Sequence, residues 1–517
     1  MNGAQALIQT LVGAGVDTCF TNPGTSEMHF VAALDTVPEM RGILGLFEGV
    51  VTGAADGYAR MAGRPAATLL HLGPGLGNGL ANLHNARRAA TSVVNVVGDH
   101  ATYHQRFDAP LQSDIKSIAR SVSGWFRSSS RAEDVAGDGA DAVAAAMGPP
   151  GQVATLVLPA DVSWLDAPGP VDARPPGGRA AVADDVVEAA AKALRSGEPA
   201  ALLVGGSVVA GERGLAAAGR VAGAAGAKLL AETFPARLAR GAGLPPVERL
   251  GYLAEFAQMQ LDGLRHLVIV DTRAPVSFFA YPDKPSDLVP DGCSVLVLAE
   301  GAGDGVGALE HLADRLGAAD DALRQFGHRP ERPTGDLTAQ TVADALGALL
   351  PEGAIVADEG NTAGLFVSGA TAGCPRHDWL TLTGGAIGYG MPVATGAAVA
   401  APEHPVVNLQ ADGSAMYTLQ ALWTQAREGL DVTTIIFNNR SYAILNLELA
   451  RVGAEPGPRA QRMLDLTGPE LDFVKLSEGL GVPATRATTA EELTTQLARA
   501  LADPGPRLID AALPTQL

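Results

Sequence analysis

The sequence VVNLQADGS at residues 406–414, followed by IIFNNRSY at residues 435–442, carries the strongest indication of architecture in this chain. The first apolar run ends in Asp412 and the second in Asn438 and Asn439. The intervening residues 416–430 have the length and period of a helix. This pattern predicts a strand, a helix and a parallel strand, with Asp412 and Asn439 at one edge of the sheet because neighbouring strand ends lie ~4.8 Å apart.

The same alternation continues outward along the chain and predicts an α/β fold with parallel sheets covered by helices on both faces. Two Pro- and Gly-rich stretches, at residues 167–178 and 328–333, are typical of linkers. We therefore expect three doubly wound domains, at residues 1–166, 181–327 and 336–517. The expected strands are residues 17–20, 67–70, 93–97, 154–158, 201–204, 267–270, 354–357, 406–409 and 433–437.

Composition excludes several classes of protein. The 517 residues carry a net charge of −19, with 56 acidic against 37 basic side chains, so binding to nucleic acid is not expected. Three scattered cysteines, Cys19, Cys293 and Cys374, fit neither a disulfide framework nor a zinc site and favour a reducing compartment. Without an export signal or an apolar run of ~18 residues, we expect a cytoplasmic protein that does not enter a membrane.

Oxygen ligands at the edge formed by Asp412 and Asn439 favour a hard cation, Mg²⁺ or Ca²⁺. Gly413 and Ser414 open a helix whose first N–H groups suit an anion, so a diphosphate paired with the cation is expected. The alternative is an ordinary Asx-capped turn followed by an Asn-rich loop.

These residues resemble the cofactor motif of thiamine diphosphate-dependent enzymes. Further segments occur in the order that this family shows: TNPGT at 21–25, LFEGV at 46–50, ADGYAR at 55–60 and GGAIGYGMP at 384–392. Within the family the chain resembles the acetolactate synthase large subunit and its homologues, and its first hundred residues are similar to benzoylformate decarboxylase.

The resemblance implies thiamine diphosphate and Mg²⁺ as cofactors, with Asp412, the side-chain oxygen of Asn439 and the main-chain carbonyl of Ser441 as metal ligands. The residues that it assigns to cofactor binding are Glu48, Asn361, Thr362, Gly384, Gly385, Ile387, Asp412, Gly413, Ser414 and Asn439. Ala411 replaces the family's usual glycine and therefore requires an ordinary backbone conformation there.

Glu48 stands at a predicted strand-to-helix junction, half buried; by itself it could be a capping or solvated acid. In the family the matching glutamate hydrogen-bonds N1′ of the aminopyrimidine and promotes proton removal from the thiazolium. Ile387 matches the apolar residue over which the cofactor folds into a V, and the alternative is one more core isoleucine. Carbonyls of Gly384 and Gly385 would hold the cofactor's amino group.

His71 ends an apolar run and precedes LGPGLGNG at residues 72–79. The glycine spacing mimics a dinucleotide site, but the proline in the turn argues against one. In benzoylformate decarboxylase a histidine at this place transfers protons, whereas a structural histidine that donates to the glycine turn is the alternative. Thr25 matches a serine that contacts the substrate carboxylate, while Ala280 stands where that enzyme has a second histidine.

Other segments are less informative. Asp99, His100 and His104 follow a buried strand and are expected either at the mouth of the site or outside it. Tyr442 and Leu445 would cover the substrate, and residues 452–458 would form a lid. The glycine turn at residues 204–207 is reminiscent of a nucleotide site, but we do not expect FAD in the middle domain.

The resemblance implies an enzyme, a transferase or a lyase, that decarboxylates a small 2-oxo acid and passes the enamine to a proton or to a second carbonyl compound. Glu48 and His71 are the expected catalytic residues, and Thr25, His71 and Tyr442 the substrate contacts. An acetolactate synthase-like carboligase is expected first, a benzoylformate decarboxylase-like enzyme and a non-catalytic cofactor-binding homologue being the alternatives. A homodimer or homotetramer with active sites between subunits is expected.

Overall fold

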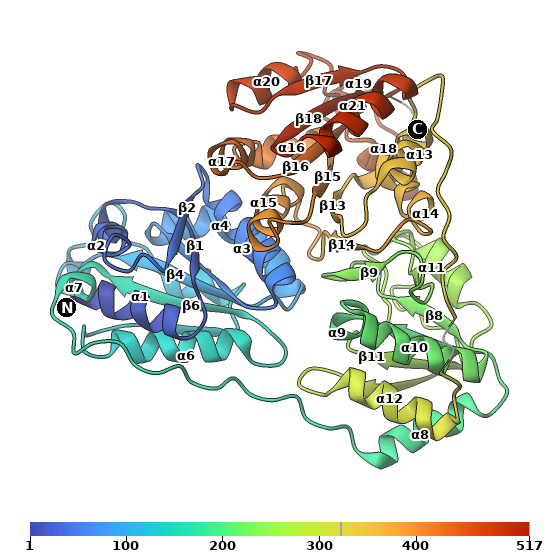
Figure 1. Cartoon of the computed structure of the whole chain (residues 1–517), viewed down its shortest axis with the longest axis horizontal. Coiled ribbons are helices and arrows are strands. Elements are labelled where there is room, and N and C mark those ends of the chain that lie inside the picture. The colour runs from blue at the N-terminus through green and yellow to red at the C-terminus, as the bar shows by residue number, and fades with distance from the viewer. Residues whose placement is uncertain (321–322, 516–517) are drawn as a thin grey trace.

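The computed structural model describes residues 1–320 and 323–515 and shows an α/β protein built on three sheets (Figure 1). In this part of the chain no helix is both long and apolar enough to cross a membrane. The expected α/β class and the three sheets are confirmed, while the domain boundaries at 166, 181, 327 and 336 stay a prediction.

The first sheet is entirely parallel and has the strand order β2-β1-β3-β4-β6-β5. Alternate residues of its strands face two separate apolar cores, one on each face. Its strands are β1 (Thr18–Asn22), β2 (Arg41–Leu44), β3 (Ala66–Leu70), β4 (Val93–Asp99), β5 (Trp125–Ser128) and β6 (Val153–Pro159). Its helices are α1 (Gly3–Gly13), η1 (Thr25–Glu27), α2 (Met28–Ala33), α3 (Glu48–Ala62), α4 (Leu72–Arg88), η2 (Gln105–Phe107), α5 (Ile115–Arg120), α6 (Val135–Met147) and α7 (Ala160–Trp164).

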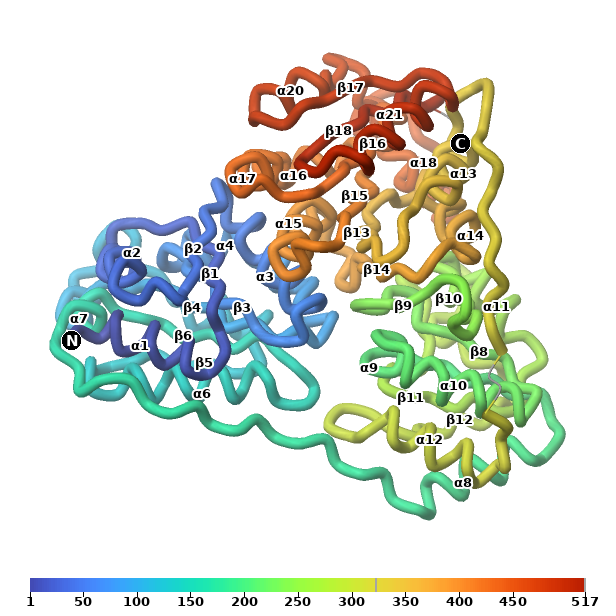
Figure 2. Tube along the Cα trace, viewed as in Figure 1, coloured from blue at the N-terminus to red at the C-terminus, as the bar shows by residue number. Residues whose placement is uncertain are grey.

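The second sheet is also parallel, with the order β10-β8-β7-β11-β12. Figure 2 shows the extended connection that leads from α7 to this body. Its strands are β7 (Ala200–Val204), β8 (Lys228–Ala231), β10 (Glu248–Arg249), β11 (His266–Val270) and β12 (Ser294–Ala299). Its helices are α8 (Asp184–Leu194), α9 (Gly206–Val209), α10 (Glu212–Ala225), α11 (Ala254–Leu261) and α12 (Gly305–Leu316).

The third sheet, of order β17-β18-β16-β15-β13-β14-β9, is parallel except at one edge. There β9 (Leu238–Arg240), from the middle of the chain, pairs antiparallel with β14. The other strands are β13 (Ile355–Glu359), β14 (His377–Thr381), β15 (Val406–Ala411), β16 (Val432–Asn438), β17 (Ala484–Ala487) and β18 (Arg507–Ala512). The helices are α13 (Ala339–Leu349), η3 (Asn361–Gly364), α14 (Val367–Ala370), α15 (Gly390–Ala400), α16 (Asp412–Thr418), α17 (Ala421–Glu428), α18 (Ala443–Arg451), α19 (Pro458–Gln461), α20 (Phe473–Gly479) and α21 (Ala490–Ala502).

Two expectations need correction. The third sheet is mixed, because β9 reaches it from residues that the sequence places in the middle domain. The single helix expected over residues 416–430 is two helices, α16 and α17, and α16 begins at Asp412 directly after the strand. The helix therefore starts at the residue expected to bind the cation.

Helices α3 and α15 lie side by side between the first and third sheets (Figure 1). Small residues allow this close approach: a Cβ added to Gly57 would lie 2.1 Å from the carbonyl oxygen of Val393, and one added to Gly396 would lie 1.8 Å from that of Ala54. Both helices share one apolar core with strands of both sheets. The packing fixes the orientation of α3, which begins at Glu48.

Candidate active site

Asp412 and Asn439 leave adjacent strands at the same edge of the third sheet, as the spacing predicts. β15 and β16 are parallel neighbours, with Ala411 opposite Phe437. Asp412 is 3% exposed and Asn439 5%. Ala411 has φ −71° and ψ 144°, an extended conformation that does not require glycine.

Hydrogen bonds join Asp412 to the turn after β16. Its Oδ2 accepts the N–H of Arg440 at 2.6 Å and its Oδ1 accepts the N–H of Gly413 at 2.7 Å. Oδ1 of Asn439 accepts the N–H of Ser441 at 3.1 Å. Burial raises the pKa of Asp412 to about 6, although the hydrogen bonds from backbone amides act in the opposite direction.

A carboxylate in this setting fits a bound cation, whose charge would offset the cost of burial. The expected donors are all oxygen atoms, the ligand type of the hard cations Mg²⁺ and Ca²⁺. Among the residues that the structure describes, no three His, Cys, Asp or Glu side chains gather to hold a metal. A cation here would thus depend on one carboxylate, neutral oxygens and the phosphates of a cofactor.

Asn361 and Thr362 lie at the same edge, in η3, which follows β13. The strand order of the third sheet reverses at β13, because β14 lies on one side of it and β15 on the other. Between β13 and β15, Nδ2 of Asn361 donates to Oγ of Ser414 at 3.0 Å. Such switch points are where open α/β sheets bind ligands. Tyr442 covers the start of α16, since a Cβ added to Gly413 would lie 2.4 Å from its ring.

The loop with Gly384, Gly385 and Ile387 lies between the first and third sheets. Asn85 of α4 donates through Nδ2 to the carbonyl of Ala386 at 2.8 Å and accepts the N–H of Ala386 at 3.2 Å. Gly385 has a φ of +72°, and a Cβ there would lie 2.7 Å from the ring of Phe278. The loop therefore depends on glycine for both conformation and space.

Glu48 is the first residue of α3 and is buried, with 7% exposure, rather than half buried as expected. Its Oε2 accepts a hydrogen bond from Nδ2 of Asn78 at 3.0 Å. A Cβ added to Gly75 would lie 3.2 Å from Oε1 of Glu48 and 3.4 Å from Cβ of His71. Glu48 and His71 therefore border the same glycine of α4.

His71 contacts a residue that sequence reasoning missed, Glu27. Nδ1 of His71 lies 2.8 Å from Oε2 of Glu27, which also accepts the N–H of Gly24 at 2.7 Å. Glu27 is fully buried, and burial raises the pKa of its carboxyl group even though His71 acts in the opposite direction. The pair lies at the switch point of the first sheet, after β1 and β3, and Thr25 begins η1 beside it.

The predicted residues thus form two groups. Thr25, Glu48 and His71 gather at the first sheet; Asn361, Thr362, Gly413, Ser414, Asp412, Asn439, Ser441 and Tyr442 gather at the third. In the described part of the chain no hydrogen bond joins Glu48 to Asp412. The two groups approach through apolar packing, because Phe47 and Val50 share a core with Ala415 and Leu419.

Arg60, in the motif at residues 55–60, fixes the loop at residues 381–389. Its guanidinium is bidentate to Asp56, with 2.8 and 2.6 Å distances, and donates to the carbonyl of Thr381 at 2.9 Å and the hydroxyl of Tyr389 at 2.9 Å. All four side chains are buried. The motif alone does not indicate this role, because the loop lies more than 300 residues further along the chain.

The loop with Asp99, His100 and His104 follows β4. Asp99 accepts the N–H of His100 at 2.7 Å and Nε2 of Gln105 at 2.9 Å, and burial raises the pKa of its carboxyl group. The rings of His100 and His104 lie 5.4 Å apart. These contacts are local to the loop and do not reach Glu48 or His71.

Helix α18 carries Leu445 and ends before the glycine-rich segment expected to form a lid. Tyr281, next to Ala280, donates its hydroxyl to Glu448 of this helix at 2.7 Å. Arg451 lies over the ring of Tyr281 at 4.2 Å. The middle part of the chain thus holds the helix that follows Tyr442.

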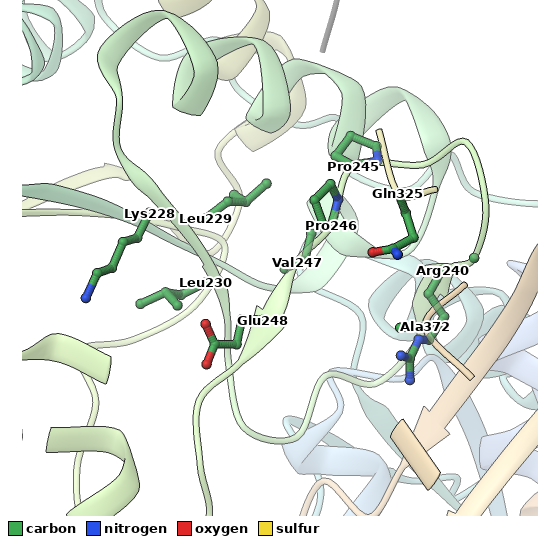
Figure 3. Close-up of a pocket in the computed structure, with 11 residues that line it drawn as sticks. Lys228, Leu229, Leu230, Arg240, Pro245, Pro246, Val247, Glu248, Gln325 and Ala372 are labelled. Carbon is green, nitrogen blue, oxygen red and sulfur yellow. The ribbon is translucent and has the colours of Figure 1, made fainter. Parts of the chain in front are cut away.

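Cavities also lie outside these groups. One of about 350 Å³ is lined by Lys228, Arg240, Glu248 and other residues near β8 and β10 (Figure 3). Another of about 90 Å³ borders Glu232 at the end of β8, where burial raises the pKa of the carboxyl group to about 7. The glycine turn after β7 lies nearby, with Ser207 donating its hydroxyl to Asp271.

Comparisons with known proteins agree with this arrangement. Residues 1–119 match the model for the thiamine pyrophosphate enzyme N-terminal TPP binding domain, and residues 363–511 match that for the C-terminal TPP binding domain. The chain is 61% identical to the "Putative acetolactate synthase large subunit IlvX" of Mycobacterium tuberculosis over 100% of this chain and 99% of that protein. It is 31% identical to benzoylformate decarboxylase of Pseudomonas aeruginosa, over 97% and 96% of the two chains. A solved structure, the thiamine diphosphate-dependent 4-hydroxybenzoylformate decarboxylase of Rhodococcus jostii RHA1, superposes with a TM-score of 0.87 at 25% identity and covers 99% of each chain.

Proposed function

The chain belongs to the thiamine pyrophosphate enzyme family, and on this premise we propose that it is a Mg²⁺-dependent enzyme that decarboxylates a small 2-oxo acid. The observation that carries the proposal is the pair of residue groups at two sheet edges. Proton-transfer groups, Glu48 and His71, occupy one edge, and the oxygen-rich group of Asp412 and Asn439 occupies the other.

The third sheet would hold the cation and the diphosphate. Asp412 provides the charge, and Asn439 and the carbonyl of Ser441 provide neutral oxygens. The N–H groups that open α16, at Gly413 and Ser414, suit phosphate oxygens. When bound, thiamine diphosphate supplies a carbon nucleophile and an electron sink for cleavage of the bond between the carboxylate and the carbonyl.

Glu48 would exchange a proton with the aminopyrimidine of the cofactor. It is buried, and among the described residues its side chain accepts from Asn78 through Oε2, which leaves Oε1 for that contact. Ile387 would contact the cofactor, and Asn85 fixes the neighbouring residue Ala386. These residues would position the cofactor and exclude water from it.

His71 would determine whether the fragment left after CO₂ departs receives a proton. Its Nδ1 faces Glu27, so Nε2 remains to give a proton to that fragment, which yields an aldehyde. Thr25, in the same segment as Glu27, would contact the substrate carboxylate, and Tyr442 would cover the substrate. This geometry favours a non-oxidative decarboxylase.

An acetolactate synthase-like carboligase is the second candidate. The name of the 61% identical relative favours it. The presence of Ala280, where benzoylformate decarboxylase carries a second histidine, also favours transfer to a second carbonyl compound over protonation.

We also propose a cytoplasmic homodimer or homotetramer whose active sites lie between subunits. Large apolar side chains are exposed near the third-sheet edge, at Leu365, Phe366, Met416 and Tyr417, as expected for a surface that a second copy covers. No nucleic acid partner is proposed for a chain with a net charge of −19.

The test is CO₂ release from a panel of 2-oxo acids, from pyruvate to benzoylformate, with and without thiamine diphosphate and Mg²⁺. We expect CO₂ only when both are present. An aldehyde product identifies the decarboxylase, and an acyloin or acetolactate identifies the carboligase. Cofactor binding without CO₂ from any acid would identify a non-catalytic homologue and contradict the proposal.

A further inference from the structure

Glu359 is a buried acid to which the function proposed above gives no role. It is the last residue of β13 and is 1% exposed. Its Oε1 accepts the N–H of Gly388 at 2.7 Å, and its Oε2 accepts the N–H groups of Tyr389 at 3.0 Å and Gly390 at 2.7 Å. Nε2 of Gln410 donates to the same Oε2 at 2.8 Å.

Three of these donors are consecutive backbone amides, and they follow Ile387 directly. Gly390 begins α15, so the carboxylate also lies where the first N–H groups of a helix have no partner within the helix. Gly390 admits nothing larger than hydrogen, since a Cβ there would lie 2.5 Å from Oε1 of Gln410. The same Cβ would lie 3.1 Å from Cβ of Glu359, so the glycine allows the loop to approach the Glu359 side chain closely.

The carbonyl of Gly388 accepts two further hydrogen bonds from side chains other than Glu359. It accepts Nδ2 of Asn82, from α4, at 3.1 Å and Oγ1 of Thr418, from α16, at 3.1 Å. The same glycine has a φ of +89°. The peptide groups of Gly388 are therefore fixed by α4, α16 and Glu359 together, and the position of Ile387 follows from that of its neighbour.

We propose that Glu359 is a positioning residue: its carboxylate sets the conformation of residues 387–390 and so places Ile387 against the cofactor. The inference rests on the proposed function, because it gives Ile387 its role there. Only a carboxylate meets all the requirements, since it offers two acceptor oxygens and no donor. A glutamine would present an NH₂ group to one set of backbone N–H groups and lose their hydrogen bonds.

A purely structural role predicts a different result. If Glu359 only capped α15, its replacement would lower stability without changing how the cofactor binds. Burial raises the pKa of Glu359 to about 7, so the ionised side chain is itself costly in the folded protein. Removal of the charge therefore need not lower the melting temperature, and stability and positioning can be separated.

The experiment compares the full-length protein with Glu359→Gln and with the control Asp138→Asn, a buried acid of α6 that pairs with Arg127 and Ser129. Hydrogen exchange is measured without cofactor, and half-saturation by thiamine diphosphate is measured at fixed Mg²⁺. We expect amides 388–390 to exchange about 10-fold faster in Glu359→Gln, with a similar increase in half-saturation. The control should alter neither measurement.

Unchanged exchange at residues 388–390, or faster exchange with normal cofactor saturation, would overturn the inference while the proposed function stands. Failure of the unmodified chain to bind the cofactor would overturn both the inference and the proposed function. Should Glu359→Gln not fold, Glu359→Asp keeps the charge but withdraws the carboxylate by one methylene. The same two measurements then apply, with the same expected directions.

Discussion

The first and third sheets are wound in the same way but have different chemistry at their switch points. At the switch point of the first sheet, Glu27 follows β1 and His71 follows β3, and the two side chains lie within hydrogen-bond distance of each other. Between β13 and β15 lie Asn361 and Asp412, whose neighbours are hydroxyl groups and backbone amides. The fold therefore provides the place for a ligand, and the residues after each strand decide what is done there.

The largest effect is expected at the first sheet, from Glu48→Gln. Loss of the carboxylate should lower CO₂ release by about 100-fold or more, because the variant cannot exchange a proton with the cofactor. Mg²⁺-dependent cofactor binding, measured by fluorescence titration, should remain close to normal. Normal turnover in this variant would contradict the proposal that the first sheet transfers protons while the third sheet binds the cofactor.

At the third sheet, Asp412→Asn should act on binding instead. Removal of the charge should raise half-saturation by Mg²⁺ by about 10–100-fold, the loss expected for a hydrogen-bonded charged group. Titration of Mg²⁺ at saturating cofactor measures this, with Asp138→Asn as control. If kcat fell while Mg²⁺ affinity stayed the same, the cation would have to be placed elsewhere.

Within the first sheet, Glu27→Gln should lower turnover by about 10-fold through its effect on His71. A double-mutant cycle with His71→Ala tests this dependence. Glu27→Gln should cost little in the His71→Ala background. An equal loss in both backgrounds would show that Glu27 acts independently of His71.

The smallest effect is expected from Ala411→Gly, which restores the residue that the family usually has. Because Ala411 already has an ordinary extended backbone, cofactor affinity should change by less than about 2-fold. The free energy of unfolding should fall by about 0.5–1 kcal/mol through the greater freedom of glycine in the unfolded chain. Cofactor titration and urea denaturation measure the two quantities, and a large gain in affinity would mean that alanine limits binding.

These two edges also differ in how far the sequence predicts them. Asp412 and Asn439 end consecutive strands, so their spacing alone predicts that they lie together. Glu48 and His71 follow only from the resemblance to a family, and their roles, like those of the other predicted site residues, stay predictions. Their proximity depends on α4, whose Gly75 lies between them, and no spacing in the sequence indicates this contact.

The residues that were missed share a physical cause. Glu27 follows a turn that contains Pro23 and Gly24, and Glu359 ends a strand. Both positions are ordinarily solvated for an acid. Their burial arises from segments distant in sequence: His71 covers Glu27, and residues 388–390 cover Glu359. Strand β9 was missed because three residues give too short a pattern and its partner β14 lies far along the chain.

Strand β9 has a practical consequence for any attempt to dissect this protein. A fragment that begins at residue 336 would lack Leu238–Arg240 and would uncover the backbone of β14 along one side of its sheet. An unpaired edge strand tends to pair with strands of other chains. Such a fragment should therefore self-associate unless β9 is supplied as a peptide or grafted onto it. The third sheet thus includes a strand from the middle of the chain, and the C-terminal part of the chain does not form the complete sheet by itself.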